Sequence, residues 1–131
     1  MVVYKLIQAG LMREIFEKYG DGNSIRGYTN VHDLVEGIVK LIDYKPKDNF
    51  EIFNLGGSER VTLNKLINIM KAHQFPNLKI KQVKRNSADV LSSIADISKA
   101  KKVLKWQPKR GFEIEIIKLC SIAKRELGEQ K

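Results

Sequence analysis

The alternation of hydrophobic and polar residues predicts helices separated by short strands. Apolar residues recur at helical spacing in four segments, and they alternate with polar residues in two shorter ones. The predicted helices cover 2–10, 33–42, 63–73 and 112–127, and the predicted strands cover 15–19 and 79–83. Gly10 is a natural helix stop and Thr62 a natural N-cap. Residues 1–131 therefore form one domain of mixed α/β or α+β class.

Two further segments have extended character. Residues 25–29 continue from the strand at 15–19 after Gly20-Asp21-Gly22-Asn23, which we interpret as a hairpin turn because glycine and asparagine tolerate positive φ. Residues 50–55 form a short β run closed by Gly56-Gly57. The Gly20-Asp21-Gly22 sequence is not a dinucleotide loop, because Ile25 stands where G-x-G-x-x-G needs its third glycine.

Acidic residues near predicted helix starts indicate capping. Asp33 falls in the first turn of the helix that begins near Asn30, and either Asp96 or Ser98 can cap a short basic helix over 99–104. We expect Asp33 and Asp96 to stabilise helix ends and not to contact a ligand.

Composition narrows the class of protein. No apolar run reaches the roughly 20 residues needed to cross a bilayer, and the N-terminus lacks the pattern of a signal peptide, so we expect a cytoplasmic protein. One cysteine and two scattered histidines provide no metal-ligand cluster. Cys120 lies in an apolar helical pattern and is predicted to be a buried, inert thiol.

Positive charge is concentrated in the second part of the chain. Residues 1–78 hold 10 Lys+Arg against 9 Asp+Glu, whereas residues 79–131 hold 14 against 6. Such an excess favours a phosphate-bearing partner, either nucleic acid or a small molecule, although a solvated lysine surface gives the same count. Aromatic residues do not interleave with the basic ones, which disfavours specific nucleic-acid binding.

A resemblance to a known family is carried by several motifs in register. Residues 19–37 read YGDGNSIRGYTNVHDLVEG, which resembles the Y-G-D-G-x-x-x-R-D-[FY]-[TI]-[YH]-V-x-D-[LI]-V-x-[GA] stretch of the extended short-chain dehydrogenase/reductases. Five shorter blocks follow in the family's order and read FNLG (53–56), VTL (61–63), RNSADV (85–90), ADISKA (95–100) and LKWQP (104–108). The chain thus resembles the C-terminal, substrate-binding lobe of the NAD-dependent nucleotide-sugar epimerases and dehydratases.

The resemblance implies a small mixed α/β substrate-binding lobe and a set of ligand contacts. It implies that Arg26 and Arg85 clamp the diphosphate of a nucleotide sugar, and that Asp89 accepts hydrogen bonds from the ribose. Guanidinium groups suit this role because they bind phosphate in a bidentate, always-charged fashion. The alternative for either arginine is a surface ion pair. Gly27 and Asn30 depart from the family's Asp and its Tyr or His, and the 85–90 block has one extra residue.

The Rossmann lobe of that family is absent from the sequence. Its Tyr-x-x-x-Lys pair is missing, because the residues four places after the tyrosines are not lysines: Gln8, Asn23, His32 and Asp48 follow Tyr4, Tyr19, Tyr28 and Tyr44. We therefore expect no catalytic residue, no metal and no NAD on this chain alone. It would be a fragment, a split subunit or a stand-alone lobe, inactive by itself, working with a Rossmann lobe or as a homo-oligomer. The alternatives are a catalytically dead scaffold and a small basic nucleic-acid-binding protein.

Overall fold

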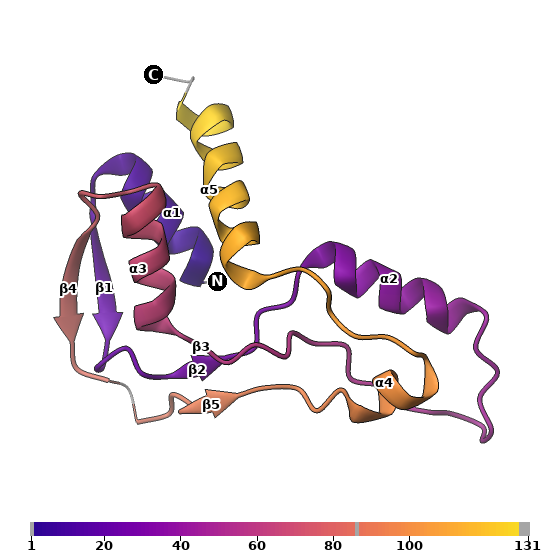
Figure 1. The fold of residues 1–131 in the computed structure, drawn as a ribbon. Helices are drawn as coiled ribbons and strands as arrows, with labels where there is room; N and C mark the ends of the chain where they lie inside the picture. Colours follow the sequence, from indigo (N-terminus) through magenta and orange to yellow (C-terminus); the bar gives the residue numbers. More distant parts are fainter. Residues whose placement is uncertain (1, 86, 129–131) are drawn as a thin grey trace.

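A computed structural model describes residues 2–85 and 87–128, and it has the mixed α/β character that the sequence predicts. The helices are α1 (Val2–Met12), α2 (Val31–Ile42), α3 (Leu63–His73), α4 (Ser98–Val103) and α5 (Phe112–Gly128). The strands are β1 (Ile15–Tyr19), β2 (Ile25–Arg26), β3 (Val61–Thr62), β4 (Lys79–Val83) and β5 (Ser92–Ser93). The elements form an elongated molecule with two halves joined by a narrow waist (Figure 1).

The larger half, which we call the helical half, contains α1, α3 and α5 packed beside the two-stranded sheet of β1 and β4 (Figure 1). Its core is one continuous cluster of buried side chains from all three helices and from β1. Leu6, Leu66, Met70 and Cys120 are fully buried at its centre. Burial raises the pKa of the Cys120 thiol to about 11, as the apolar pattern around this cysteine led us to expect.

The predicted hairpin at residues 20–23 is wrong. β1 pairs in parallel with β4, from Ile15 opposite Lys79 to Tyr19 opposite Val83, and β2 belongs to a different sheet. Gly20 and Gly22 do adopt positive φ, 71° and 82°. The tight turn is thus present, but it carries the chain from one sheet to the other and does not fold it back. The residues of the turn determine its backbone conformation, but they do not determine which strand β1 pairs with.

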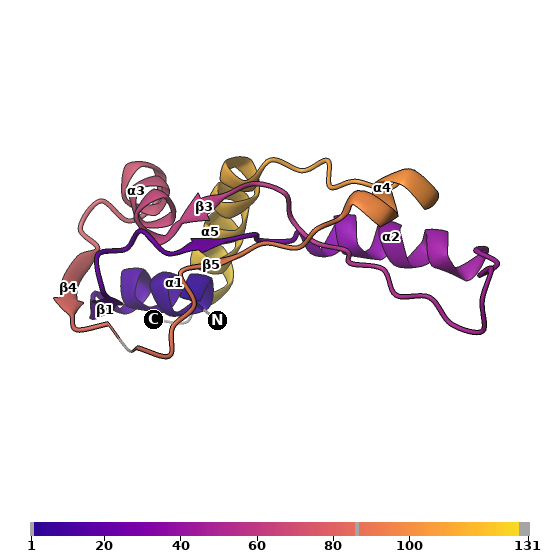
Figure 2. The ribbon, with the colours of Figure 1, turned by 90° about the horizontal axis from the view of Figure 1, so that it is seen from below.

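The waist consists of three short strands in the order β3–β2–β5 (Figure 2). β2 is antiparallel to β3 and parallel to β5. Just beyond these strands the main chains come very close together. A Cβ atom on Gly57 would lie 1.7 Å from the carbonyl oxygen of Tyr28, and one on Gly56 would lie 2.6 Å from the Cβ of Ala95. Only glycine permits this approach.

The smaller half, which we call the Trp106 half, holds α2, α4 and the segment 50–55. Its core contains three buried residues, Ala100, Leu104 and Trp106, with partly buried side chains around them, among which Phe53 and Leu55 belong to the segment. The predicted strand at 50–55 is not a strand in the structure. It is anchored by Glu51, whose pKa is held at about 2 by hydrogen bonds from the backbone of Lys47 and from Lys99 and Tyr44.

The helix ends follow the predicted chemistry in part. Thr62 caps α3, with its hydroxyl accepting from the backbone N–H of Lys65 at 3.1 Å. The predicted cap of α4 by Asp96 or Ser98 is wrong, since the N-cap is Ile97, without a side-chain cap hydrogen bond. Asp96 instead accepts from the backbone N–H of Ser98 at 2.9 Å, just before the helix. Gly10 does not stop α1, which runs to Met12; instead Gly10 leaves room for the ring of Phe75, 2.5 Å from where a Cβ would stand. None of the helices within the described residues is long and apolar enough to span a membrane.

Candidate nucleotide-binding site

Arg26 lies in the centre of the waist sheet. The backbone N–H groups on either side of it, from Ile25 and Gly27, donate to the carbonyls of Leu91 and Ser93 at 2.8 and 3.0 Å. Its side chain is partly buried, and Nη1 donates to the carbonyl oxygen of Ile25 at 2.8 Å. Among the residues that the structure describes, Arg26 forms no ion pair with a carboxylate.

Arg85 and Asp89 lie on the connection between β4 and β5. Arg85 donates from Nη2 to the backbone carbonyl of Asp89, so the guanidinium holds the turn that follows it. Its aliphatic part lies against Gly20, where a Cβ atom would come within 3.2 Å of the Cβ of Arg85. Both side chains are exposed, and the Asp89 carboxylate makes no ion pair within residues 2–85 and 87–128.

The structure brings all three predicted residues to one cavity. Arg26, Arg85 and Asp89 line a space of about 360 Å³, which we call the arginine cavity. This volume falls at the lower end of the range for small-molecule sites. The remaining walls are formed by both aromatic and polar side chains, which come from α1, β1, α3 and the loops: Val2, Lys5, Phe16, Glu17, Tyr19, Asp21, Ser24, Tyr28, Leu63 and Leu91.

The charged side chains around the arginine cavity bond mainly to nearby backbone and amide groups. Asp21 accepts from the backbone and the side chain of Asn23 at 2.9 and 3.0 Å, and these hydrogen bonds lower the pKa of its carboxyl group. Asp21 is therefore tied to its own turn. Within residues 2–85 and 87–128, both arginines hydrogen-bond to backbone carbonyls, which leaves most of their N–H donors available for an incoming anion.

A larger cavity, of about 740 Å³, lies between the start of α2 and α5 and contains none of the predicted site residues. Its arginine is already neutralised, because Nη1 of Arg110 is 2.5 Å from Asp33 and 3.0 Å from Glu36. A phosphate would have to displace both carboxylates to bind there. We therefore favour the smaller cavity as the anion site, even though it has half the volume.

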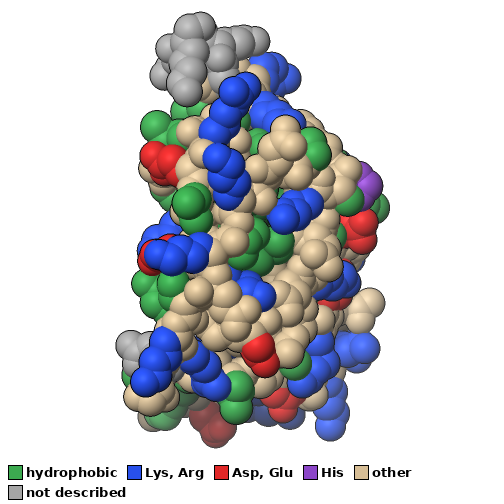
Figure 3. Space-filling view, turned by 90° about the vertical axis from the view of Figure 1, so that its left-hand side faces the viewer, with side chains coloured by type: hydrophobic (Ala, Val, Ile, Leu, Met, Phe, Trp, Pro, Cys, Tyr) green, Lys and Arg blue, Asp and Glu red, His purple; other side chains and the backbone are tan. Residues whose placement is uncertain are grey.

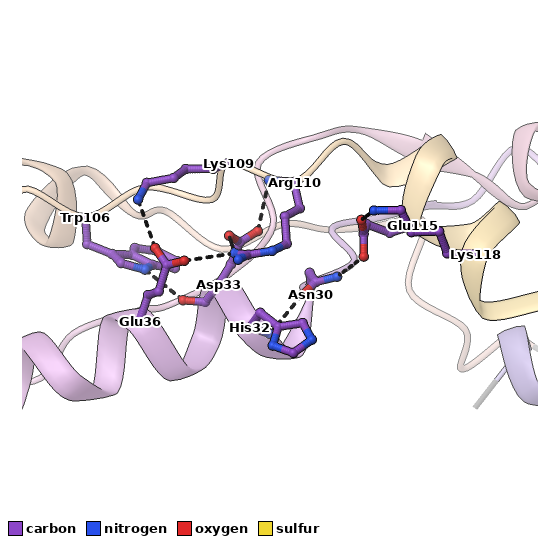
Figure 4. A network of polar contacts seen from close by, with 9 residues as sticks. All are labelled: Asn30, His32, Asp33, Glu36, Trp106, Lys109, Arg110, Glu115 and Lys118. Carbon is purple, nitrogen blue, oxygen red and sulfur yellow. Dashed lines mark hydrogen bonds and ion pairs between the residues drawn. The ribbon is translucent and has the colours of Figure 1, made fainter. Parts of the chain in front are cut away.

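The sequence analysis missed the polar network that joins α2 to the connection between α4 and α5 (Figure 4). Asp33 is 1% exposed, and it pairs with Arg110 instead of capping α2. Burial alone would raise the pKa of this carboxyl group, but hydrogen bonds from the backbone of Arg110 and Lys109 and from the guanidinium outweigh it and lower the pKa. The indole N–H of Trp106 donates to the backbone oxygen of Asp33 at 2.8 Å. The partners are more than 70 residues apart, so no local pattern reveals them.

The two departures from the family motif have structural roles. Asn30 is the N-cap of α2, accepting from the backbone N–H of His32 at 2.8 Å, and its amide donates to Glu115 of α5 at 2.8 Å (Figure 4). At Gly27, a Cβ atom would lie 2.6 Å from the carbonyl oxygen of Gly57. The aspartate of the motif would therefore force the waist apart in this chain.

Comparison with known proteins identifies the family of the chain. The model of the GDP-mannose 4,6-dehydratase family matches residues 2–119. The UDP-glucuronate 4-epimerase of Thermodesulfobacterium geofontis is 32% identical over 86% of this chain and 34% of its own length. The solved UDP-glucose 4-epimerase of Thermotoga maritima, with UDP-glucose, is 28% identical with a TM-score of 0.86, covering 97% of this chain and 40% of that one. The UDP-glucuronic acid 4-epimerase of Bacillus cereus, with UDP-glucuronic acid and NAD, has a TM-score of 0.87 at 23% identity, over 96% and 40%.

These findings confirm the predicted class, the C-terminal region of the NAD-dependent epimerases and dehydratases of nucleotide sugars. The chain belongs to the GDP-mannose 4,6-dehydratase family. It spans about a third of the length of the curated relatives that it matches.

Proposed function

We propose that this chain is the lobe that holds a nucleotide-diphosphate sugar, and that the arginine cavity receives the diphosphate. The observation that carries the proposal is the meeting of Arg26, Arg85 and Asp89, from segments about 60 residues apart, at one cavity. Two guanidinium groups can share the charge of a diphosphate, and a nearby carboxylate can accept from ribose hydroxyls. The solved relatives from Thermotoga maritima and Bacillus cereus contain UDP-glucose and UDP-glucuronic acid, which supports a ligand of this class.

The residues of this chain do not fit NAD. The loop 20–23, which carries Gly20 and Gly22, does not begin a helix, so it offers no helix N-terminus to a pyrophosphate. We therefore assign NAD to the complementary lobe of the full enzyme, where transient oxidation and re-reduction of the sugar would take place. The chain alone is expected to be inactive, and a cytoplasmic location remains a prediction.

The distribution of basic side chains favours a small anion over nucleic acid. On the face that carries β1 and β4, lysine and arginine lie in separate groups between hydrophobic, neutral and acidic side chains (Figure 3). Several basic residues of the second part of the chain already contact carboxylates: Lys81, Lys99, Lys109, Arg110 and Lys118. A continuous basic stripe, which a nucleic-acid backbone requires, is not formed on this face.

The test uses a chimera in which this chain replaces the matched region of the Thermotoga maritima epimerase. Arg26→Ala and Arg85→Ala should each weaken UDP binding by about 10- to 150-fold, since a hydrogen bond to a charged group contributes about 1.5–3 kcal/mol. Because the two arginines would share one diphosphate, the double variant should lose less than the sum. Titration calorimetry with UDP measures these effects.

Arg125→Ala is the matched control, since this exposed arginine on α5 lies outside the arginine cavity. It should bind UDP as the parent does, and all variants should keep the parent melting temperature. If Arg26→Ala or Arg85→Ala stays within about twofold of the parent, that arginine is not part of the site.

A further inference from the structure

The turn at residues 20–23 is held in place by the start of α3. The backbone N–H of Asn64 donates to the carbonyl oxygen of Gly22 at 3.0 Å, and that of Leu63 donates to the carbonyl oxygen of Ser24 at 3.3 Å. The first N–H groups of a helix have no partner within the helix, so the turn satisfies two of them. The turn and the start of α3 are therefore one polar unit, although they are far apart in sequence.

The side chain of Asn64 lies at the centre of this unit. Its Nδ2 donates to the carbonyl oxygen of Asp21 at 2.9 Å and to the side-chain oxygen of Asn23 at 3.2 Å. Its Oδ1 accepts from Nζ of Lys18 at 3.2 Å, and the same Nζ donates to the carbonyl oxygen of Asp21 at 3.1 Å. A lysine only donates and a carbonyl only accepts, so these partners determine which way the amide of Asn64 points. We call these two residues the Lys18–Asn64 pair.

The shape of the turn is matched to the amide of Asn64. Gly22 is buried and has a φ of 82°. A Cβ atom at this position would collide with Oδ1 of Asn64. The amide therefore occupies the space that a side chain at position 22 would take, and the turn closes directly around it.

The turn in turn supplies much of the arginine cavity. Four residues of the segment 19–26 line the cavity: Tyr19, Asp21, Ser24 and Arg26. Gly20 lies against Arg85, where a Cβ atom would come within 3.2 Å of the Cβ of that arginine. Within the described chain, neither member of the Lys18–Asn64 pair lines the cavity itself. The pair can therefore act on a ligand only through the residues that it places.

We propose that Asn64, together with Lys18, is a positioning residue for the arginine cavity. By holding the turn, it determines where the chain enters the waist sheet at Arg26 and where Gly20 meets Arg85. Both guanidinium groups are then in place before an anion arrives, which removes part of the cost of ordering them on binding. This role rests on the proposed function, since it assumes that the ligand binds in the cavity.

The isosteric substitution Asn64→Asp tests the contact with the turn. Aspartate has the same shape and keeps Lys18 as a partner, but it has no N–H to donate. In the isolated chain, hydrogen exchange at the amides of Asn23 and Leu63 should become about 10-fold faster, as expected for a local opening. The amide of Gln74, at the other end of α3, should keep its protection. Unchanged exchange at Asn23 and Leu63, or equal acceleration at Gln74, would contradict the proposal.

UDP affinity tests the effect on the site. In the chimera described above, Asn64→Asp should weaken UDP binding by about 10-fold, because both guanidinium groups remain but are held less precisely. Lys18→Met should have a similar effect, and Lys18→Arg should restore most of the affinity because arginine can donate to the same oxygen atoms. Asn68→Asp, at an exposed position of the same helix, is the matched control and should bind UDP as the parent does. Affinity of Asn64→Asp within about twofold of the parent would overturn the proposal.

A double variant separates positioning from a purely structural role. If Asn64 acts by placing the arginines, Asn64→Asp should weaken UDP binding by only about threefold in a chimera that already carries Arg26→Ala, since one of the two placed groups is then missing. An undiminished 10-fold loss in that background would show that Asn64 acts on the site by another route, which contradicts the proposal.

The outcomes for the two proposals are separable. Failure of the proposed function would appear as unchanged UDP affinity in Arg26→Ala and Arg85→Ala, with exchange at Asn23 and Leu63 still faster in Asn64→Asp. Failure of the positioning role would appear as unchanged UDP affinity in Asn64→Asp, in a chimera whose arginine variants still lose UDP.

Discussion

The two halves of the molecule differ in how completely their cores are closed. Among the described residues, the helical half buries fifteen hydrophobic side chains in one cluster, whereas the Trp106 half buries three. The exposed aliphatic side chains of α2 and the exposed Phe50 and Ile52 all belong to the smaller half. A core of three residues is too small to stabilise a unit on its own. The helical half therefore has the more complete core, although both halves also carry exposed hydrophobic side chains, among them Ile114 and Leu127 on α5.

The largest expected effect is the removal of Trp106. This side chain is 2% exposed and is the centre of the small core, so Trp106→Ala should destabilise that half by about 3–5 kcal/mol. Amides of α2 and α4 should then exchange much faster, while those of α3 and α5 keep their protection. Leu66→Ala is the matching variant in the helical half, and it should accelerate amide exchange throughout the chain. Equal acceleration in all four helices of Trp106→Ala would show that the halves unfold as one unit.

A smaller effect is expected from Arg110→Ala. It leaves the buried Asp33 carboxylate without its cation, which should lower the free energy of unfolding, though by less than for a fully buried pair because Arg110 is itself one-third exposed. The lowered pKa of Asp33 means that this stability is present above its usual value of 3.8 and is lost as the pH falls further. Urea unfolding at pH 7 and pH 3 should therefore show a smaller difference between variant and parent at pH 3. An equal difference at both pH values would contradict the assignment.

The smallest expected effects come from two strained positions, one in each half. Lys105 and Arg13 have φ of 50° and 56°, in the left-handed region that favours glycine. Lys105→Gly and Arg13→Gly should each stabilise the protein by about 0.5–1 kcal/mol, after the added freedom of the unfolded chain is subtracted. Exchange should slow mainly in α4 for Lys105→Gly and in α1 for Arg13→Gly. A loss of stability in either variant would mean that the side chain contributes more than its backbone strain.

Periodicity predicted the helices well because each forms from residues close in sequence. The limits of α3 were predicted residue for residue, from the N-cap Thr62 to His73. Pairing partners were not predictable in the same way. The turn at residues 20–23 was recognised, yet β1 pairs with β4 about 60 residues later, and nothing in the local pattern specifies that choice. The strand character of 50–55 was visible in the sequence, but a strand needs a neighbour, and the described chain provides none.

Only those residues of the candidate site that belong to recognisable sequence motifs were predictable. Arg26, Arg85 and Asp89 were selected through a resemblance, and the structure places them at one cavity. The pair of Asp33 and Arg110 was missed because an acidic residue in a first helical turn has a sufficient local explanation. Asp33 is buried because Trp106 and Arg110, from the segment after α4, lie against it, and only the tertiary structure reveals these contacts.

The glycines of the waist have a consequence for which substitutions this chain tolerates. At Gly27 and Gly57 the main chain lies against a neighbouring main-chain carbonyl oxygen with no side chain between them. A side chain at either position would push two main chains apart. Substitution at Gly27 or Gly57 would therefore change how the helical half and the Trp106 half lie relative to each other, whereas substitution of exposed residues in either half would leave that spacing unchanged.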